Sequence, residues 1–145
     1  MSNRRIYMGV IILAAVLAYG GASQADEPFT LRSLRGTFGF SGSGTLGGAS
    51  AAVVGLTRFD GVGGCVSTAV LNAAGTVSPL TSTECSYTVN SDGTGSQNLT
   101  FGPFGPFTSS FVIVDAKKEV HFILSDGFGG GTVASGVSRR QARGD

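Results

Sequence analysis

Hydrophobic and polar residues alternate with a period of two along most of the chain beyond residue 35, and glycine-rich turns interrupt the alternation at short intervals. This pattern is typical of an antiparallel β-meander with one buried face. Helical periodicity is confined to a lead-in over residues 26–35, where we expect one helical turn at most. The alternation predicts about eight strands, over residues 36–42, 51–60, 64–72, 83–90, 95–101, 111–115, 119–126 and 132–139.

Three segments interrupt the strand pattern. Residues 73–80, which contain Pro79, are predicted to be a turn-rich excursion. Gly102–Phe107 breaks the alternation because its two prolines cannot donate hydrogen bonds to a ladder. Gly42–Gly47 nominally matches the glycine pattern of a dinucleotide-binding loop, with Asp60 downstream, but no amphipathic helix follows it. A flexible hairpin is the better interpretation, and no cofactor is predicted.

Antiparallel strands of this number and length close most simply into a barrel, which leaves no exposed edge. Glycines inside predicted strands, such as Gly39 and Gly55, ease coiling and bulges. We therefore predict an all-β, mainly antiparallel barrel of about eight strands over residues 36–138, followed by a flexible basic tail over residues 139–145. A β-sandwich is the alternative, because strand count and turn spacing do not distinguish the two folds.

The first 25 or so residues have the form of an export signal. Asn3–Arg5 is a short positive region, Ile6–Tyr19 is an apolar run, and Gly20–Ala25 contains the small residues that signal peptidase prefers. We expect cleavage after Ala25 and a secreted or periplasmic protein that does not insert into the membrane. An uncleaved anchor is the alternative, but it requires a longer apolar segment.

Cys65 and Cys85 are the two cysteines of the chain. Export would place them in an oxidising compartment, where such a pair usually bonds. The bridge would close a loop of about 21 residues, which is worth about 3 kcal/mol in the chain-entropy estimate. A zinc site is not predicted, because two thiols and one distant histidine do not complete a tetrahedral site.

Charge is sparse, at 13% of residues against 41% hydrophobic. Removal of Arg4 and Arg5 with the leader would leave a net charge of about −1, so a nucleic-acid partner is not predicted. Four carboxylates fall at predicted strand ends, where they can cap turns or, alternatively, gather around calcium. Turn capping explains them more simply, and no metal is predicted: these residues are Asp60, Asp92, Asp115 and Asp126.

His121 is the only imidazole, so it is the first candidate for a general base of ordinary pKa. The alternation places it on the face of Glu119 and Ile123, but it does not decide whether that face points inward. No serine has the surroundings of a nucleophile elbow, so we predict no catalytic residue.

Aromatic residues are numerous, with ten Phe in the chain. In a barrel some of them must line the interior, where they either fill the core or bound a small apolar cavity. The candidate lining residues are Phe38, Phe40, Tyr87, Phe101, Phe111 and Phe122.

Two Asp-Gly turns, Asp60–Gly63 and Asp92–Gly95, follow the D-G-x-G pattern, and the strands Ser86–Asn90 and Phe111–Asp115 flank the second turn. With these motifs, residues 36–141 resemble small exported bacterial proteins with calycin or allene-oxide-cyclase-type barrels. The resemblance implies a barrel and transfers no catalytic residue. We expect a non-enzymatic binding or structural protein, with a small apolar molecule as the candidate ligand. The alternative is a barrel cyclase or isomerase that confines a small apolar substrate.

Overall fold

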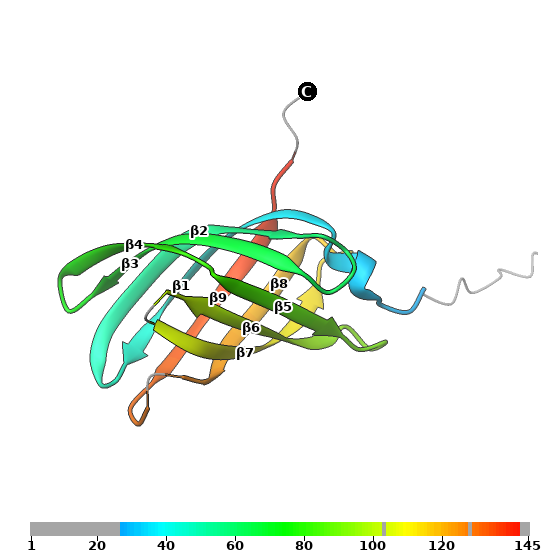
Figure 1. Cartoon of the computed structure of the whole chain (residues 1–145). Coiled ribbons are helices and arrows are strands. Elements are labelled where there is room, and N and C mark those ends of the chain that lie inside the picture. Colours follow the sequence, from blue (N-terminus) through cyan, green and yellow to red (C-terminus); the bar gives the residue numbers. More distant parts are fainter. Residues whose placement is uncertain (1–26, 103, 128, 143–145) are drawn as a thin grey trace, which may run out of the picture.

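The structure is a computed structural model, and it describes residues 27–102, 104–127 and 129–142. The leader predicted over residues 1–25 and its cleavage point lie outside the described residues. The described part contains a 3₁₀ turn and nine strands (Figure 1). These elements are η1 (Leu31–Leu34), β1 (Gly36–Leu46), β2 (Ala49–Phe59), β3 (Cys65–Ala73), β4 (Thr76–Thr81), β5 (Glu84–Val89), β6 (Thr94–Phe101), β7 (Phe104–Val114), β8 (Glu119–Asp126) and β9 (Val133–Arg140).

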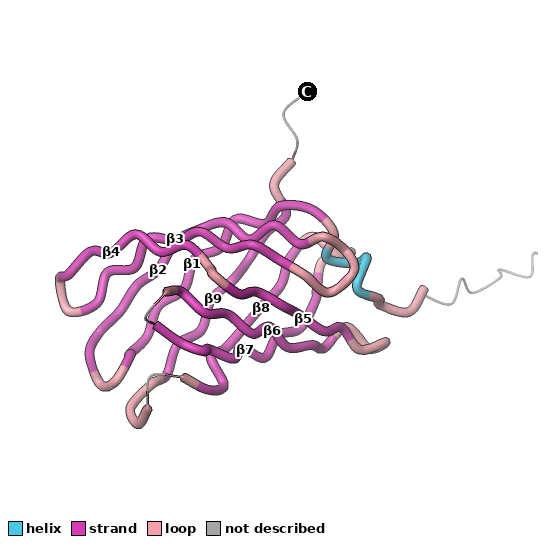
Figure 2. The backbone as a smooth tube through the Cα atoms, viewed as in Figure 1, coloured by secondary structure: helices cyan, strands magenta, loops and turns pink. Residues whose placement is uncertain are grey.

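The strands form one sheet in the order β4-β3-β2-β1-β9-β8-β7-β6-β5, and every neighbouring pair is antiparallel. The sheet is strongly curled, so that β1, β8 and β9 cross behind β3, β5 and β6 (Figure 2). The prediction of an all-β antiparallel meander is confirmed. The sheet is single, unlike the two sheets of the alternative sandwich, and it has nine strands rather than about eight.

The two ends of the sheet approach each other beside η1, where β3 contacts β5. An antiparallel bridge joins Gly64 to Ser86. The backbone N–H of Tyr87 donates to the carbonyl of Gly63 at 2.9 Å, and that of Ser82 donates to the carbonyl of Ser67 at 2.8 Å. These contacts hold the curled sheet around an interior at this end of the molecule.

The additional strand is β4, which lies in the segment predicted to be a turn-rich excursion. Pro79 is compatible with a strand here because β4 pairs only with β3, and an edge strand needs donors on one side only. The hairpin predicted over residues 42–47 is present, but its turn comes later than expected. β1 continues through Leu46, and the chain turns at Gly47 and Gly48, whose φ angles are 57° and 83°.

The proline-containing segment over residues 102–107 does not end the sheet. β7 begins at Phe104, and a register shift opposite Leu99–Phe101 of β6 accommodates the irregular stretch. The tail predicted from residue 139 is wrong at its first two positions, because Arg139 and Arg140 are the last residues of β9, and residues 143–145 lie outside the described part. The lead-in forms one helical turn, as the sequence indicated.

The packed core lies at the η1 end of the curled sheet. Leu34 of η1 and Phe38 of β1 are fully buried there. The ring of Phe59 packs edge-on against Phe38 at 5.6 Å and against Tyr87 at 4.9 Å, measured between ring centroids. The Arg140 guanidinium lies 4.8 Å from the centroid of the Phe38 ring and donates to the carbonyl of Ser33 at 3.0 Å. Aromatic packing and these contacts tie η1 to the sheet.

Candidate functional site

Beyond the packed core, the inner face of the sheet encloses a cavity of about 130 Å³. Leu34, Phe59 and Val120 line it at the η1 end. Toward the opposite end the lining side chains of Leu46 and Leu71 are partly exposed, so solvent reaches the interior from that side. The lining is mainly apolar, which suits an apolar molecule rather than an ion.

Glycines opposite three phenylalanines keep this interior hollow. Phe40 lies opposite Gly55, Phe111 opposite Gly95, and Phe122 opposite Gly136 in the strand register. A Cβ atom added at any of the three glycines would come within 2.8 Å of the facing ring and within 2.2 Å of a backbone carbonyl oxygen. The three rings therefore lie against the wall over a bare backbone, and all three line the cavity.

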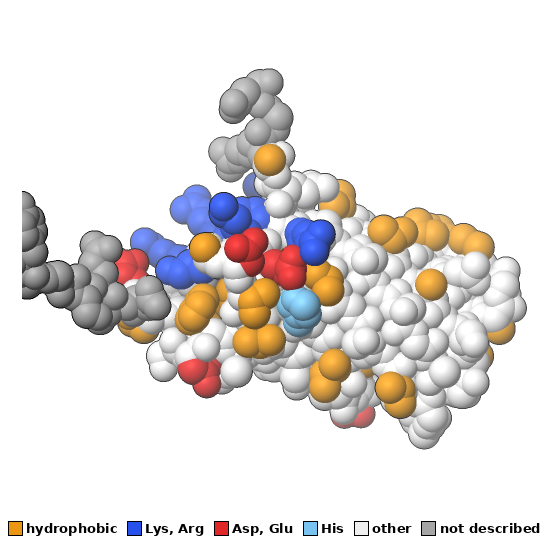
Figure 3. Space-filling model, turned by 180° about the vertical axis from the view of Figure 1, so that it is seen from behind, with side chains coloured by type: hydrophobic (Ala, Val, Ile, Leu, Met, Phe, Trp, Pro, Cys, Tyr) orange, Lys and Arg blue, Asp and Glu red, His pale blue; other side chains and the backbone are white. Residues whose placement is uncertain are grey.

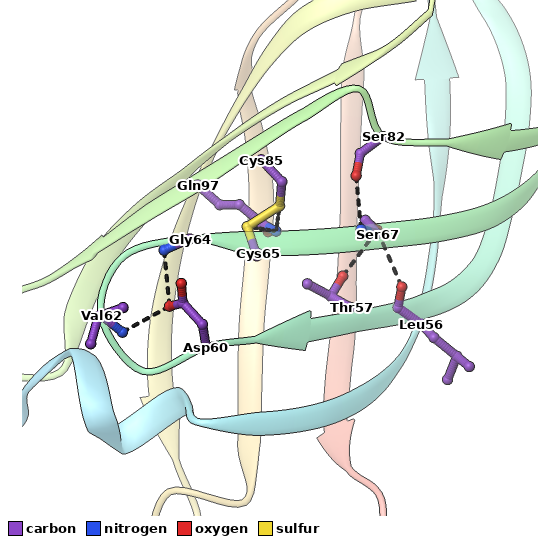
Figure 4. The surroundings of a disulfide bond; sticks show 10 residues. All are labelled: Leu56, Thr57, Asp60, Val62, Gly64, Cys65, Ser67, Ser82, Cys85 and Gln97. Carbon is purple, nitrogen blue, oxygen red and sulfur yellow. Dashed lines mark hydrogen bonds between the residues drawn. A yellow bond between two sulfur atoms is a disulfide. The ribbon is translucent and has the colours of Figure 1, made fainter.

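Two hydroxyls inside the sheet are paired with each other. Thr57 of β2 and Ser67 of β3 are buried, and their oxygen atoms are 3.0 Å apart (Figure 4). Ser67 also donates to the Leu56 carbonyl at 3.3 Å, and its backbone N–H donates to the Ser82 hydroxyl at 2.9 Å. These bonds satisfy the pair and link β2 and β3 to the segment that leads into β5.

A second polar group at the cavity comes from β6 and β7. Gln97 lies opposite Ser109 in the register, and both line the cavity. The Gln97 amide nitrogen lies 3.7 Å from the Cys65 sulfur and 3.6 Å from the Cys85 sulfur. Ser138 of β9 also lines the cavity. Unlike Thr57 and Ser67, neither Ser109 nor Ser138 makes a side-chain hydrogen bond to another residue of the described part.

Cys65 and Cys85 form the predicted disulfide, which joins β3 to β5 (Figure 4). The bond joins the same two strands as the contacts of Gly64 and Tyr87 described above, so it reinforces them. A disulfide is consistent with an oxidising extracellular compartment. Within the described ranges, no helix has the length and apolar character needed to cross a lipid bilayer.

The six predicted lining residues occupy two places. Phe40, Phe101, Phe111 and Phe122 line the cavity, and Phe111 belongs to the packed core cluster as well. Phe38 and Tyr87 lie in the core cluster alone.

The Tyr87 hydroxyl donates to the Leu31 carbonyl at 3.0 Å, and burial raises the pKa of this phenol.

Gln97, Ser109 and Ser138 were not predicted as lining residues. Alternation could have found Ser109, because it lies between the inward-facing Phe107 and Phe111.

His121 faces outward, which decides the direction that the sequence left open. Its side chain is 51% exposed, and its Nε2 atom lies 2.7 Å from a Glu119 carboxylate oxygen (Figure 3). Arg139 donates to the other carboxylate oxygen at 2.5 Å. These two hydrogen bonds, that of Arg139 first, lower the pKa of Glu119. His121 also borders a shallow outer depression with Val112, Ile123 and Val137.

Asp60 and Asp92 cap their turns as the sequence predicted, and Asp126 accepts, within the described part, only from the N–H of the next residue, Gly127. Asp60 accepts hydrogen bonds from the backbone N–H groups of Val62 and Gly64 at 2.8 and 3.0 Å. Asp92 accepts from the Thr94 hydroxyl at 2.7 Å and from the Thr94 N–H at 3.0 Å, and these bonds lower the Asp92 pKa. Among the residues that the structure describes, no group of three or more potential metal ligands is found.

The curled sheet and hollow interior define a protein of the small β-barrel type, and comparison with solved structures supports this class. The chain is similar to EF1p2_mFAP2b bound to DFHBI, with a TM-score of 0.52 and 16% identity over 78% of this chain and 100% of that chain. It is similar to the redesigned β-barrel mFAP1 bound to DFHBI, with a TM-score of 0.50 and 21% identity over 77% and 98%. A de novo designed fluorescence-activating β-barrel gives a TM-score of 0.52 and 15% identity over 78% and 99%.

These likenesses establish the fold alone. No family model matches the chain, and no curated protein matches it. The resemblance to calycin and allene-oxide-cyclase-type barrels is thus supported as far as the barrel fold, and its assignment to those families stays a prediction.

Proposed function

We propose that this protein is an exported β-barrel that binds a small, largely apolar ligand in its interior. The observation that carries the proposal is the cavity whose walls include three phenylalanine rings that lie close over Gly55, Gly95 and Gly136. Larger residues at these glycines would fill the interior. The cavity therefore depends on the three pairs of a glycine and a phenylalanine. Its volume of about 130 Å³ is close to that of an apolar cavity able to hold a benzene-sized molecule.

The proposal includes closure of the sheet into a barrel. The disulfide, the bridge between Gly64 and Ser86, and the hydrogen bond from Tyr87 to Gly63 support closure between β3 and β5. It also includes export and removal of residues 1–25, supported by the form of the leader and by the disulfide. Binding without chemistry is the simpler role, because the only imidazole lies on the outer surface.

The similar solved structures add support from function. Two of them are β-barrels bound to DFHBI, a small molecule. They show that a chain of similar fold can hold a small molecule.

Thermal denaturation with small apolar compounds tests the proposal. We expect toluene to raise the melting temperature of the mature protein. Ala69→Phe should abolish the shift, because Ala69 is buried and lines the cavity. Thr68→Phe is the matched control, because Thr68 is the neighbouring exposed residue of β3. Native mass spectrometry of protein from its source would then identify a retained ligand.

The outcomes separate clearly. If toluene and a panel of fatty acids all leave the melting temperature unchanged, the interior is not a binding site and the proposal is wrong. If Ala69→Phe and Thr68→Phe respond to toluene alike, binding occurs elsewhere on the molecule, and the proposal is again wrong.

A further inference from the structure

We propose that the ligand of this cavity is an uncharged molecule with an apolar body and a hydroxyl group, which hydrogen-bonds to Gln97 and Ser109. This inference rests on the proposed binding function and specifies the chemistry that the site recognises. It begins from the two kinds of polar group that line an otherwise apolar interior: one pair is already satisfied, and the other is available.

Thr57 and Ser67 form the satisfied pair. Their hydroxyls contact each other at 3.0 Å, and Ser67 has a further acceptor in the Leu56 carbonyl. Hydrogen bonds already made within the protein leave little to gain from a ligand. This pair therefore stabilises the sheet and does not recognise a ligand.

Ser109 is in the opposite situation. Its residue is only 5% exposed, and its hydroxyl has no hydrogen-bond partner among the described residues. The described part nevertheless contains no inaccessible side-chain oxygen or nitrogen without a partner. The Ser109 oxygen is therefore reachable, and because Ser109 lines the cavity, that access is from the cavity. A ligand placed there must offer the hydroxyl a partner or leave it unsatisfied.

Gln97 lies directly opposite Ser109 and is oriented by the disulfide. Its amide nitrogen contacts both sulfur atoms, which occupies the donor side of the amide and leaves the carbonyl oxygen as an acceptor (Figure 4). An amide acceptor beside a serine hydroxyl suits a group that donates and accepts at once. A hydroxyl is the smallest group that does both.

The ligand is uncharged because the cavity offers no countercharge. Its described lining residues carry aliphatic, aromatic, hydroxyl and amide side chains. A carboxylate or ammonium group buried among them would lose hydration without gaining an ion pair, which is more costly than burial of a neutral hydroxyl.

Three ring compounds of similar size test this inference by calorimetric titration of the mature, disulfide-bonded protein: toluene, phenol and benzoate. Toluene fills apolar space, phenol adds a neutral hydroxyl, and benzoate adds a charge. We expect phenol to bind at least as tightly as toluene despite its greater affinity for water, and benzoate to bind much more weakly than either at neutral pH.

Variants locate the recognition. Ser109→Ala and Gln97→Met should each reduce phenol affinity about tenfold, the effect of one lost hydrogen bond, and leave toluene affinity within about twofold. Ser110→Ala is the matched control, because Ser110 is the next residue of β7 and is exposed. Retained toluene binding also shows that each variant is folded.

Each result has one meaning. If toluene binds but phenol loses no more affinity than toluene in Ser109→Ala and Gln97→Met, the hydroxyl inference is wrong and the proposed function stands. If benzoate binds as tightly as phenol, the uncharged class is wrong. If neither toluene nor phenol binds the unmodified protein, the proposed function itself fails and the inference fails with it.

Discussion

Both halves of the curled sheet carry inward-facing aromatic residues, but these residues pack into a core in one half and border a cavity in the other. At the η1 end, the rings of Phe38, Phe59 and Tyr87 pack edge to face against one another and bury Leu34. In the other half, Phe40 and Phe122 lie over glycines and border empty space. At Phe40 and Phe122, the glycine opposite the ring leaves no side chain to fill the space that the ring borders.

Charge and covalent support follow the same division. On the rear face, Lys and Arg side chains gather over the half that carries η1 (Figure 3). Arg140 binds the carbonyl groups of Arg35 and Ser33, and the disulfide joins β3 to β5 near the same end. We infer that the η1 half supplies most of the stability, which leaves the cavity half free to remain hollow. Five experiments test this division.

The largest expected effect is truncation in the packed half. Phe38→Ala should lower the free energy of unfolding by about 3–5 kcal/mol, because Phe38 is fully buried and supports both Phe59 and Arg140. Leu99→Ala in the cavity half should cost clearly less, because Leu99 is partly exposed and already borders empty space. Urea denaturation measures both, and equal losses would contradict the division.

Loss of the disulfide should be the next largest effect. We expect the Cys65→Ser, Cys85→Ser double variant to be about 3 kcal/mol less stable, because the unfolded chain regains the entropy that the bridge removes. Urea denaturation of oxidised protein, reduced protein and the double variant provides the measurement. The reduced protein and the double variant should agree, and unchanged stability in both would show that the β3–β5 hydrogen bonds suffice alone.

A methyl group added at a glycine of the cavity wall should clash with the facing phenylalanine ring and overpack the site. Gly136→Ala places a Cβ 2.5 Å from the Phe122 ring and 2.2 Å from the Ser41 carbonyl oxygen. We expect a loss of about 1–3 kcal/mol together with weaker toluene binding. Gly39→Ala is the control, because its added Cβ would make only ordinary contacts, the nearest at 3.6 Å. Similar behaviour of the two variants in denaturation would show that the glycines do not shape the cavity.

Tyr87 should give the packed half a dependence on alkaline pH. Its phenol pKa is raised in the folded state, so the stability that it contributes is complete below the ordinary tyrosine pKa of about 10 and is lost as pH rises through the folded value. Tyr87→Phe should cost about 1 kcal/mol at neutral pH and flatten this loss. Denaturation across alkaline pH measures it, and a slope that persists in the variant would assign it to other groups.

The smallest effect should come from the outer surface. Glu119→Gln should lower the melting temperature slightly, because Glu119 pairs with Arg139 and His121 near solvent. The Glu119 pKa is lowered, so its contribution is present above the ordinary glutamate pKa and is lost as pH falls through the folded value. High salt should remove the difference between variant and unmodified protein. A difference that survives high salt would contradict an electrostatic origin.

Local features of this protein were predictable from its sequence. The all-β meander follows from alternation, the turns at Asp60 and Asp92 follow from Asp-Gly chemistry, and the bridge between Cys65 and Cys85 follows from an even cysteine count. The strands and turns depend on residues close in sequence, and two cysteines allow only one intramolecular pairing. The strand β4 was missed because Pro79 is acceptable only at an edge, and edge position is a property of the assembled sheet.

The cavity depended on pairings that no local pattern contains. Phe38 and Phe40 have the same inward direction in one strand, yet one lies in the core and the other lines the cavity. Phe40 faces Gly55 on β2, whereas Phe38 faces Thr57 and packs against Phe59, and strand register brings these residues into place. Alternation likewise placed His121 on one face of its strand without deciding whether that face points inward or outward. Alternation and turn chemistry thus determined the strands and the bridge, whereas register and curling, which join distant residues, decided which side chains surround the hollow.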